Sequence, residues 1–189
     1  MIKSCDPLPD DENGGAAGAK TLAKLLSIIR SDSQLVIGVF DRDREGIREY
    51  ENLPNYFDID DTLECKISRS KRSVAILLPI PLSRKTYADY ENLVIEFYFR
   101  DEILERKTAA GRGLSFKYPK KKETRIINGR PVPSTEIVEE DKSFLEGRAI
   151  GDGKVIFAKK IIPSLSATEF ENFKLIFDKI DKIIQELTG

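Results

Sequence analysis

Two continuous apolar runs constrain the fold of this chain more than any other feature. Residues 34–40 read QLVIGVF and residues 73–81 read SVAILLPIP, and neither run alternates between apolar and polar residues. A β-branched run without alternation is typical of a strand that is covered on both faces. Leucine and isoleucine recur at helical spacing over residues 19–32, and a second helix is expected over residues 47–53. This order predicts an α/β fold with a mostly parallel sheet and helices on both faces.

The remaining segments predict additions to this core. Residues 87–104 have a helical pattern, whereas the composition between residues 105 and 149 becomes charged and rich in proline. Asn128-Gly129 stands there between two apolar runs, which is a hairpin signal. We interpret residues 1–104 as the core, residues 105–149 as an inserted loop and hairpin region, and residues 150–189 as C-terminal helices that pack on the core.

The C-terminal segment predicts an amphipathic helix. Ser166 and Glu169 have the spacing of a capping box, in which the two residues bond reciprocally to the start of a helix. Six apolar residues then recur on one face of a helix. They are Phe170, Phe173, Phe177, Ile180, Ile184 and Leu187. We expect this face to pack against the core.

The absence of histidine limits the chemistry that the chain can perform. It excludes Ser-His-Asp and Cys-His catalysis, histidine-dependent metal nucleases and most zinc sites. Oxygen-rich sites without histidine suit a hard cation such as Mg²⁺. Cys5 and Cys65 form no metal-binding spacing, which is typical of a reduced chain. No apolar run is long enough to span a membrane and the N-terminus has no signal-peptide pattern, so we expect a cytoplasmic protein.

Two aspartates directly follow the first apolar run. Asp41 and Asp43 would lie at the carboxyl end of the strand, where ligands bind in parallel α/β sheets. An extended backbone sends both aspartates to one side and Arg42 to the other. One interpretation is a metal site, because two neighbouring carboxylates repel each other unless a cation lies between them. The alternative is that Asp43 caps the next helix and Asp41 is a solvated loop residue.

The sequence GGAAGAKTLAKLL, followed by QLVIGVFDRDREGIREYENL, resembles the TOPRIM domain. This module binds metal in topoisomerases, bacterial primases and the overcoming-lysogenization-defect (OLD) nucleases, and the likeness is greatest to OLD-type defence nucleases. In these proteins a glycine-rich turn leads to a helix, an apolar strand, Asp-x-Asp-x-x-Gly and another helix. The resemblance is specific over residues 10–53 and weaker over residues 73–104 and 150–189. It implies a TOPRIM-like, Rossmann-like core.

The resemblance also implies roles for individual residues. It assigns Asp41, Asp43 and Glu96, the last within LVIEFYF, to a site for Mg²⁺ or Mn²⁺. Lys154, within GDGKVIF, would contact a phosphate or the transition state. Two plainer interpretations remain open: Glu96 is an exposed helix acid paired with a neighbouring cation, and Lys154 is a lysine without a function at the N-terminus of a helix.

One part of the TOPRIM pattern has no match in this sequence. The domain normally opens with a strand and a Glu-Gly-x-x-Asp turn, whose glutamate acts as general acid or base or as a further metal ligand. No such turn precedes the glycine-rich segment. We therefore expect that the chain is the C-terminal part of a longer protein, that it is a degenerate domain, or that a partner supplies the glutamate. Without that glutamate the chain would be inactive alone.

The function expected from the resemblance is Mg²⁺-dependent cleavage of nucleic acid in phage defence. Expected partners are DNA or another nucleic acid, an ATPase domain or partner subunit, and a second copy of the chain. A non-catalytic scaffold that docks a partner protein is the main alternative, and a phosphate-handling enzyme with Asp41 as nucleophile is a further one. Because the formal net charge is −1, nucleic-acid binding would depend on local basic runs. Those runs contain Arg69, Lys71, Arg72, Lys120, Lys121 and Lys122.

Overall fold

The chain divides into two units in a computed structural model. The structure describes residues 18–28, 34–58, 64–117, 120–127, 130–137 and 147–188. The first unit contains the described residues up to Pro79 and from Phe170 onward, and the second is Ile80–Glu169. Within the described ranges, no helix combines the length and the apolar character that crossing a membrane requires.

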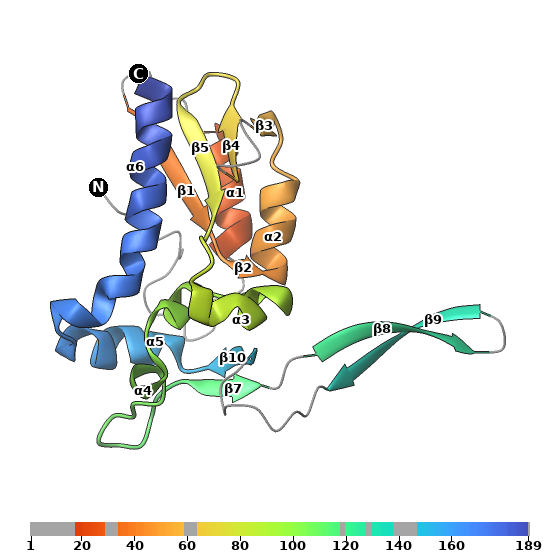
Figure 1. The fold of residues 1–189 in the computed structure, drawn as a ribbon, viewed down its shortest axis with the longest axis vertical. Coiled ribbons are helices and arrows are strands. Elements are labelled where there is room, and N and C mark those ends of the chain that lie inside the picture. Colours follow the sequence, from red (N-terminus) through yellow and green to blue (C-terminus); the bar gives the residue numbers. More distant parts are fainter. Residues whose placement is uncertain are drawn as a thin grey trace. The chain divides into compact units, whose positions relative to one another are not determined.

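The first unit is built on a four-stranded sheet in the order β1-β5-β4-β3 (Figure 1). The strands are β1 (Val36–Phe40), β3 (Tyr56–Asp58), β4 (Cys65–Ser68) and β5 (Ser73–Leu77). β1 and β5 pair in parallel, with Val36 opposite Ser73 and Phe40 opposite Leu77. β4 pairs antiparallel with both β5 and β3. The predicted α/β fold is therefore confirmed, but the sheet is mixed in the described residues and not mostly parallel.

The length of one connection explains why the parallel arrangement does not continue. Residues 69–72 alone join β4 to β5, and the Lys71 N–H closes this turn by donating to Ser68 O at 2.9 Å. A parallel neighbour would need a crossover of about a dozen or more residues. The two strands must therefore form a hairpin.

Helices cover both faces of this sheet, as the sequence predicted. They are α1 (Gly18–Ile28), α2 (Arg44–Glu51) and α6 (Lys174–Thr188). In β5, Ala75 and Leu77 pack in the cluster that contains residues of α1 and α2, whereas Val74 and Ile76 pack in the cluster that contains Ile183 of α6. A strand with helices on both faces needs an apolar residue at every position, which explains the continuous run in β5.

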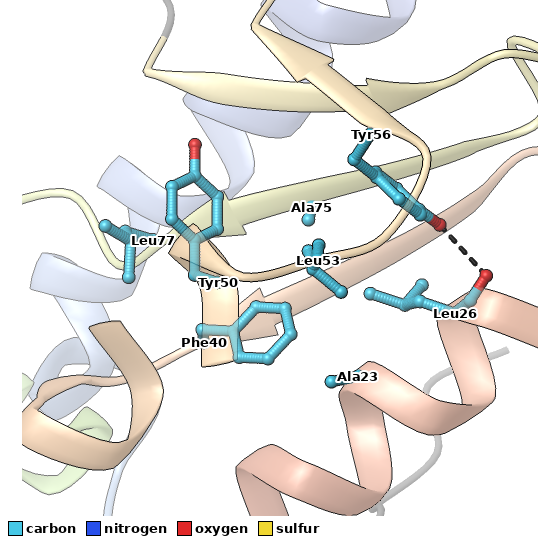
Figure 2. Packing of buried hydrophobic residues seen from close by; sticks show 8 residues of the cluster. All are labelled: Ala23, Leu26, Phe40, Tyr50, Leu53, Tyr56, Ala75 and Leu77. Atoms are coloured by element: carbon cyan, nitrogen blue, oxygen red, sulfur yellow. Dashed lines mark hydrogen bonds between the residues drawn. The ribbon is translucent and has the colours of Figure 1, made fainter. Parts of the chain in front are cut away.

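The cluster between the sheet and the α1–α2 pair contains aromatic residues that tie its elements together (Figure 2). Phe40 from β1 lies edge-on to Tyr50 from α2, with ring centroids 6.1 Å apart. The Tyr56 hydroxyl donates to Leu26 O in α1 at 3.1 Å, and its oxygen lies 2.6 Å from Ser73 Oγ. The buried hydroxyl is thus satisfied, and it links α1 to two strands.

The buried face of α6 differs from the predicted one. Ile176 and Ile183 are its buried residues among those described, and Ile180 and Leu187 pack with Ile183 against the sheet. Phe177 and Ile184 were expected on this face but are exposed by 52% and 38%. Ile180 and Leu187 were predicted on this face and do pack there, so the buried stripe is the predicted one turned toward Ile176 and Ile183.

One half of the predicted capping box is present. The Ser166 N–H donates to Glu169 Oε2 at 2.7 Å, and this bond together with Arg106 lowers the pKa of the Glu169 carboxyl group. The element that begins there is a 3-10 helix, η5 (Ala167–Phe173), and α6 follows it.

The second unit consists of short elements. They are η1 (Leu82–Arg84), α3 (Lys85–Asp89), β6 (Asn92–Leu93), η2 (Ile95–Tyr98), α4 (Asp101–Leu104), β7 (Ser115–Lys117), β8 (Lys120–Ile127), β9 (Arg130–Ile137), β10 (Ala149–Asp152), α5 (Lys154–Ile156), the π-helix η3 (Phe157–Ile161) and η4 (Ile162–Ser164). β10 and β7 pair antiparallel, as do β8 and β9. The strands of the predicted hairpin are confirmed, and its Asn128-Gly129 turn lies outside the described residues.

The predicted helix over residues 87–104 is wrong. This segment is divided among α3, β6, η2 and α4, and Glu91 has a left-handed φ of 55°. Many of its large side chains are buried, namely Tyr87, Leu93, Val94, Phe97, Tyr98, Phe99, Ile103 and Leu104. A single straight helix presents one apolar stripe to a core, so it could not bury three consecutive residues such as 97–99.

Buried Arg84 organises the irregular segment. Its guanidinium donates to Phe97 O at 2.9 Å and to Phe99 O at 2.8 Å, and it forms a 2.6 Å ion pair with Asp101. The same group lies 5.2 Å from the Tyr87 ring centroid. One side chain therefore satisfies carbonyl groups on both sides of Tyr98 that no regular ladder would satisfy.

We expect Arg84→Met to destabilise the protein by about 3 kcal/mol, because two buried carbonyl groups and Asp101 lose their partner. The matched control is Arg100→Met, since Arg100 is an exposed arginine of the same unit, and a change below about 0.5 kcal/mol is expected for it. Urea denaturation followed by circular dichroism measures both. Equal stability of the two variants would contradict the organising role of Arg84.

Candidate metal site

The two aspartates lie at the carboxyl end of the parallel strand pair. β1 ends at Phe40, whose carbonyl oxygen accepts from Leu78 N–H at 2.9 Å, immediately after the end of β5. Asp41 follows Phe40, and Arg42 and Asp43 form the two-residue strand β2. Both aspartates are half-buried. Their placement at this edge agrees with the sequence-based prediction.

Asp43 is the N-cap of α2. Its backbone is extended, with φ −93° and ψ 172°, and its Oδ1 accepts from the Gly46 N–H at 2.7 Å. The capping interpretation of Asp43 is therefore confirmed. The cap does not exclude a metal, because a carboxylate has a second oxygen and several lone pairs.

Gly46 allows the chain to turn back closely over the aspartates. A Cβ atom at this position would lie 2.1 Å from Asp41 O and 3.1 Å from Asp43 Oδ1. The first distance is too short for a side chain, because it involves backbone that cannot move aside easily, and the second is tight. The missing Cβ of Gly46 thus allows the Asp41 carbonyl and the Asp43 carboxylate to lie close to the first turn of α2.

Arg42 is held by contacts that the sequence analysis did not anticipate. Its Nε donates to Leu78 O, and its second terminal nitrogen lies 2.6 Å from Glu64 Oε2. The same glutamate oxygen is 3.6 Å from Lys179 Nζ in α6. Glu64 and Lys179 are distant from Arg42 in sequence and carry no motif, so no local pattern could have identified them.

The donors at this edge fit a hard cation in kind. Carboxylate oxygen is the ligand that Mg²⁺ prefers, and Mg²⁺ commonly takes one or two protein carboxylates together with water and substrate phosphate. Asp41 and Asp43 could provide two such ligands. In the part of the chain that the structure describes, no group of three or more His, Cys, Asp or Glu side chains gathers to hold a metal ion.

Glu96 and Lys154 lie together in the second unit. Glu96 belongs to η2 and Lys154 begins α5, and Lys154 Nζ is 3.2 Å from Glu96 Oε2. Gly153 positions the lysine, because it has a left-handed φ of 90° and its Cβ would lie 2.1 Å from Gly113 O. The expected pairing of Glu96 with a neighbouring cation is thus confirmed, but its expected exposure is wrong, because the side chain is only 14% exposed.

The first basic run lies away from the aspartates. Arg69, Lys71 and Arg72 are exposed in the turn between β4 and β5, which precedes the amino end of β5. Arg72 O accepts from Val36 N–H at 2.9 Å, so the turn also adjoins the start of β1. Asp41 follows the other end of that strand. The three cations therefore do not join the aspartates in one site.

The second basic run, Lys120, Lys121 and Lys122, begins β8 and pairs with Ile137, Glu136 and Thr135 of β9. The backbone of these lysines is described and their side chains lie outside the described part of the structure.

Comparison of the chain with family models, curated proteins and solved structures found no match.

We expect Asp43→Ala to lower the free energy of unfolding by about 1 kcal/mol, because α2 loses its N-cap bond. Asp43→Asn should cost much less, since an asparagine oxygen can accept the same bond from Gly46 N–H. Urea denaturation of both variants separates capping from charge. Equal losses in the two variants would show that the negative charge, and not the cap, stabilises this turn.

Proposed function

We propose that this chain is a TOPRIM-like nuclease domain that cleaves DNA or another nucleic acid with Mg²⁺ or Mn²⁺. The observation that carries the proposal is the position of Asp41-Arg42-Asp43 directly after β1, at the carboxyl end of the parallel β1–β5 pair. Ligands of parallel α/β sheets bind at this end. The Asp-x-Asp-x-x-Gly spacing, with Gly46 closing tightly over Asp41, agrees with the TOPRIM resemblance.

In this proposal Asp41 and Asp43 hold the metal ion. The two carboxylate oxygens of Asp43 have different partners: Oδ1 accepts from the Gly46 N–H, and the other oxygen would bind the cation. The cap thereby fixes the orientation of a metal ligand. A bound divalent ion would supply an activated water molecule and would neutralise charge on the leaving oxygen of a phosphodiester.

Glu96 and Lys154 would act as a pair. The resemblance assigns Glu96 to the metal, but its 3.2 Å ion pair with Lys154 supports a positioning role for the glutamate. Lys154 would then direct positive charge at a phosphate of the substrate, where such charge stabilises the transition state. Gly153 fixes the backbone at the start of α5, which limits where the lysine can reach.

The second candidate function is a non-catalytic scaffold that binds a partner protein. It is favoured by contacts that account for Arg42 and Asp43 without a metal. Asp43 caps α2, and Arg42 bonds to Leu78 O and Glu64. The absence of the TOPRIM glutamate motif from this sequence also favours the scaffold. This reason is lost where another segment or a partner supplies the glutamate.

The nuclease proposal predicts nicking of supercoiled plasmid in Mg²⁺ or Mn²⁺. Asp41→Asn and Asp43→Asn should each reduce the rate by about 100-fold or more, because a ligand charge is removed while the size of the side chain and the helix cap are retained. The control is Asp181→Asn, an exposed aspartate of α6, and it should cleave like the unchanged protein.

A parallel titration with Mn²⁺, followed by electron paramagnetic resonance, separates the two candidates. Metal binding that is lost in Asp41→Asn and Asp43→Asn supports the metal site even when the chain alone does not cleave. Neither cleavage nor Mn²⁺ binding in the unchanged protein would reject the nuclease proposal and favour the scaffold.

A further inference from the structure

Two nearly buried cations share one carboxylate beside the end of β5. The side chains of Arg42 and Lys179 are each 12% exposed, whereas that of Glu64 is 56% exposed. Glu64 Oε2 lies 2.6 Å from Arg42 and 3.6 Å from Lys179 Nζ. All three residues belong to the first unit. The group therefore carries one more positive charge than negative charge.

The ammonium group of Lys179 is poorly satisfied. Among the described residues it has a 3.4 Å hydrogen bond to Leu77 O and the 3.6 Å ion pair with Glu64. Hydrogen bonds between charged groups are normally about 2.7–2.9 Å long, and an ammonium group has three donors. Burial lowers the pKa of Lys179, the Glu64 carboxylate opposes this shift, and the neighbouring Arg42 adds to it. A ligand with more acceptor oxygens than one carboxylate would satisfy this group better.

Glu64 has the properties of an occupant that can be displaced. Its backbone has a left-handed φ of 45°, which is uncommon for a residue other than glycine or asparagine. One of its oxygens serves both cations, and more than half of its side chain is exposed. Movement of Glu64 away from Arg42 would uncover two cations directed toward one point.

We propose that Arg42 and Lys179 form a phosphate-binding subsite whose anion position is taken by the Glu64 carboxylate in this structure. A phosphate offers several oxygens, so it can accept from the planar guanidinium fork and from the ammonium group together. The inference rests on the proposed function for the source of this phosphate, which is the backbone of the nucleic-acid substrate. Glu64 would then exclude anions until substrate competes for the two cations.

The position of the subsite supports this source. Arg42 lies between Asp41 and Asp43 in the chain, and alternate residues of an extended backbone point to opposite sides. Asp43 caps α2 on one face of the sheet, whereas Lys179 comes from α6 on the other. A nucleic-acid strand that crosses the carboxyl edge of β1 and β5 would meet the proposed metal ligands, Asp41 and Asp43, beside Arg42 of the subsite, which lies between them in the protein sequence.

Binding of a fluorescent oligonucleotide in EDTA tests the subsite without cleavage. Lys179→Gln should weaken binding by about 10-fold and reduce the dependence of log K on log salt by about one phosphate contact. Glu64→Gln should strengthen binding about three-fold or more, because the competing charge is removed. The control Lys174→Gln removes the same charge from the exposed part of α6, and its affinity should stay within about two-fold of the unchanged protein.

A second measurement needs no variant that could fail to fold. In the unchanged protein with ¹³C-labelled lysine, the Lys179 Cε resonance should shift on addition of inorganic phosphate or of the oligonucleotide. A shift with phosphate but not with the oligonucleotide would identify free phosphate as the ligand. No shift with either, or equal affinities of Lys179→Gln and Lys174→Gln, would overturn the subsite.

The outcome of this binding assay does not depend on the outcome of the cleavage test of the nuclease proposal. The binding assay contains no metal, so the subsite can be present in a chain that does not cleave. Conversely, metal-dependent cleavage with an affinity that Glu64→Gln does not raise would support the nuclease and reject Glu64 as an occupant of a phosphate position.

Discussion

The parallel pairing of β1 with β5 is the constraint on which the first unit depends. All five residues of β5 are buried, so its two faces must both be covered, and the clusters with α1 and α2 and with α6 cover them. Parallel pairing also brings the ends of the two strands to one edge, where Leu78 N–H bonds to Phe40 O. The position of Asp41, Arg42 and Asp43 follows from this register, because they continue β1 beyond that edge.

Sequence patterns predicted the elements of this unit better than their directions. The apolar runs located β1 and β5, and even Gly38 within β1 has a reason, since its missing Cβ leaves room for Leu26 of α1. The mixed direction of the sheet came from the short turn after β4, which a pattern of hydrophobicity does not express. In the second unit, Arg84 replaces a regular hydrogen-bond ladder with side-chain bonds, so helical periodicity over residues 87–104 was misleading.

The candidate site was predictable only where its residues are neighbours in sequence. Asp41, Asp43 and Gly46 form a spacing that can be read directly, and both interpretations of Asp43 could be stated in advance. The ion pair of Glu96 with Lys154, and the contacts of Arg42 with Glu64 and Lys179, join residues that are distant along the chain. Such pairs depend on how helices and strands pack, and local spacing contains no information about them.

The alternation of charge along Asp41-Arg42-Asp43 has a consequence for any ligand at this edge. An extended backbone sends neighbouring side chains to opposite sides, so the Asp43 carboxylate bonds to the first turn of α2 whereas the Arg42 guanidinium pairs with Glu64, which also pairs with Lys179 of α6. A nucleic-acid backbone carries anionic phosphates and, in the proposed reaction, approaches together with a cation. The aspartates would serve the cation, and Arg42 with Lys179 would serve a phosphate. One three-residue segment could then supply both kinds of contact. Before substrate binds, the Gly46 N–H holds the Asp43 carboxylate and the Glu64 carboxylate holds the Arg42 guanidinium.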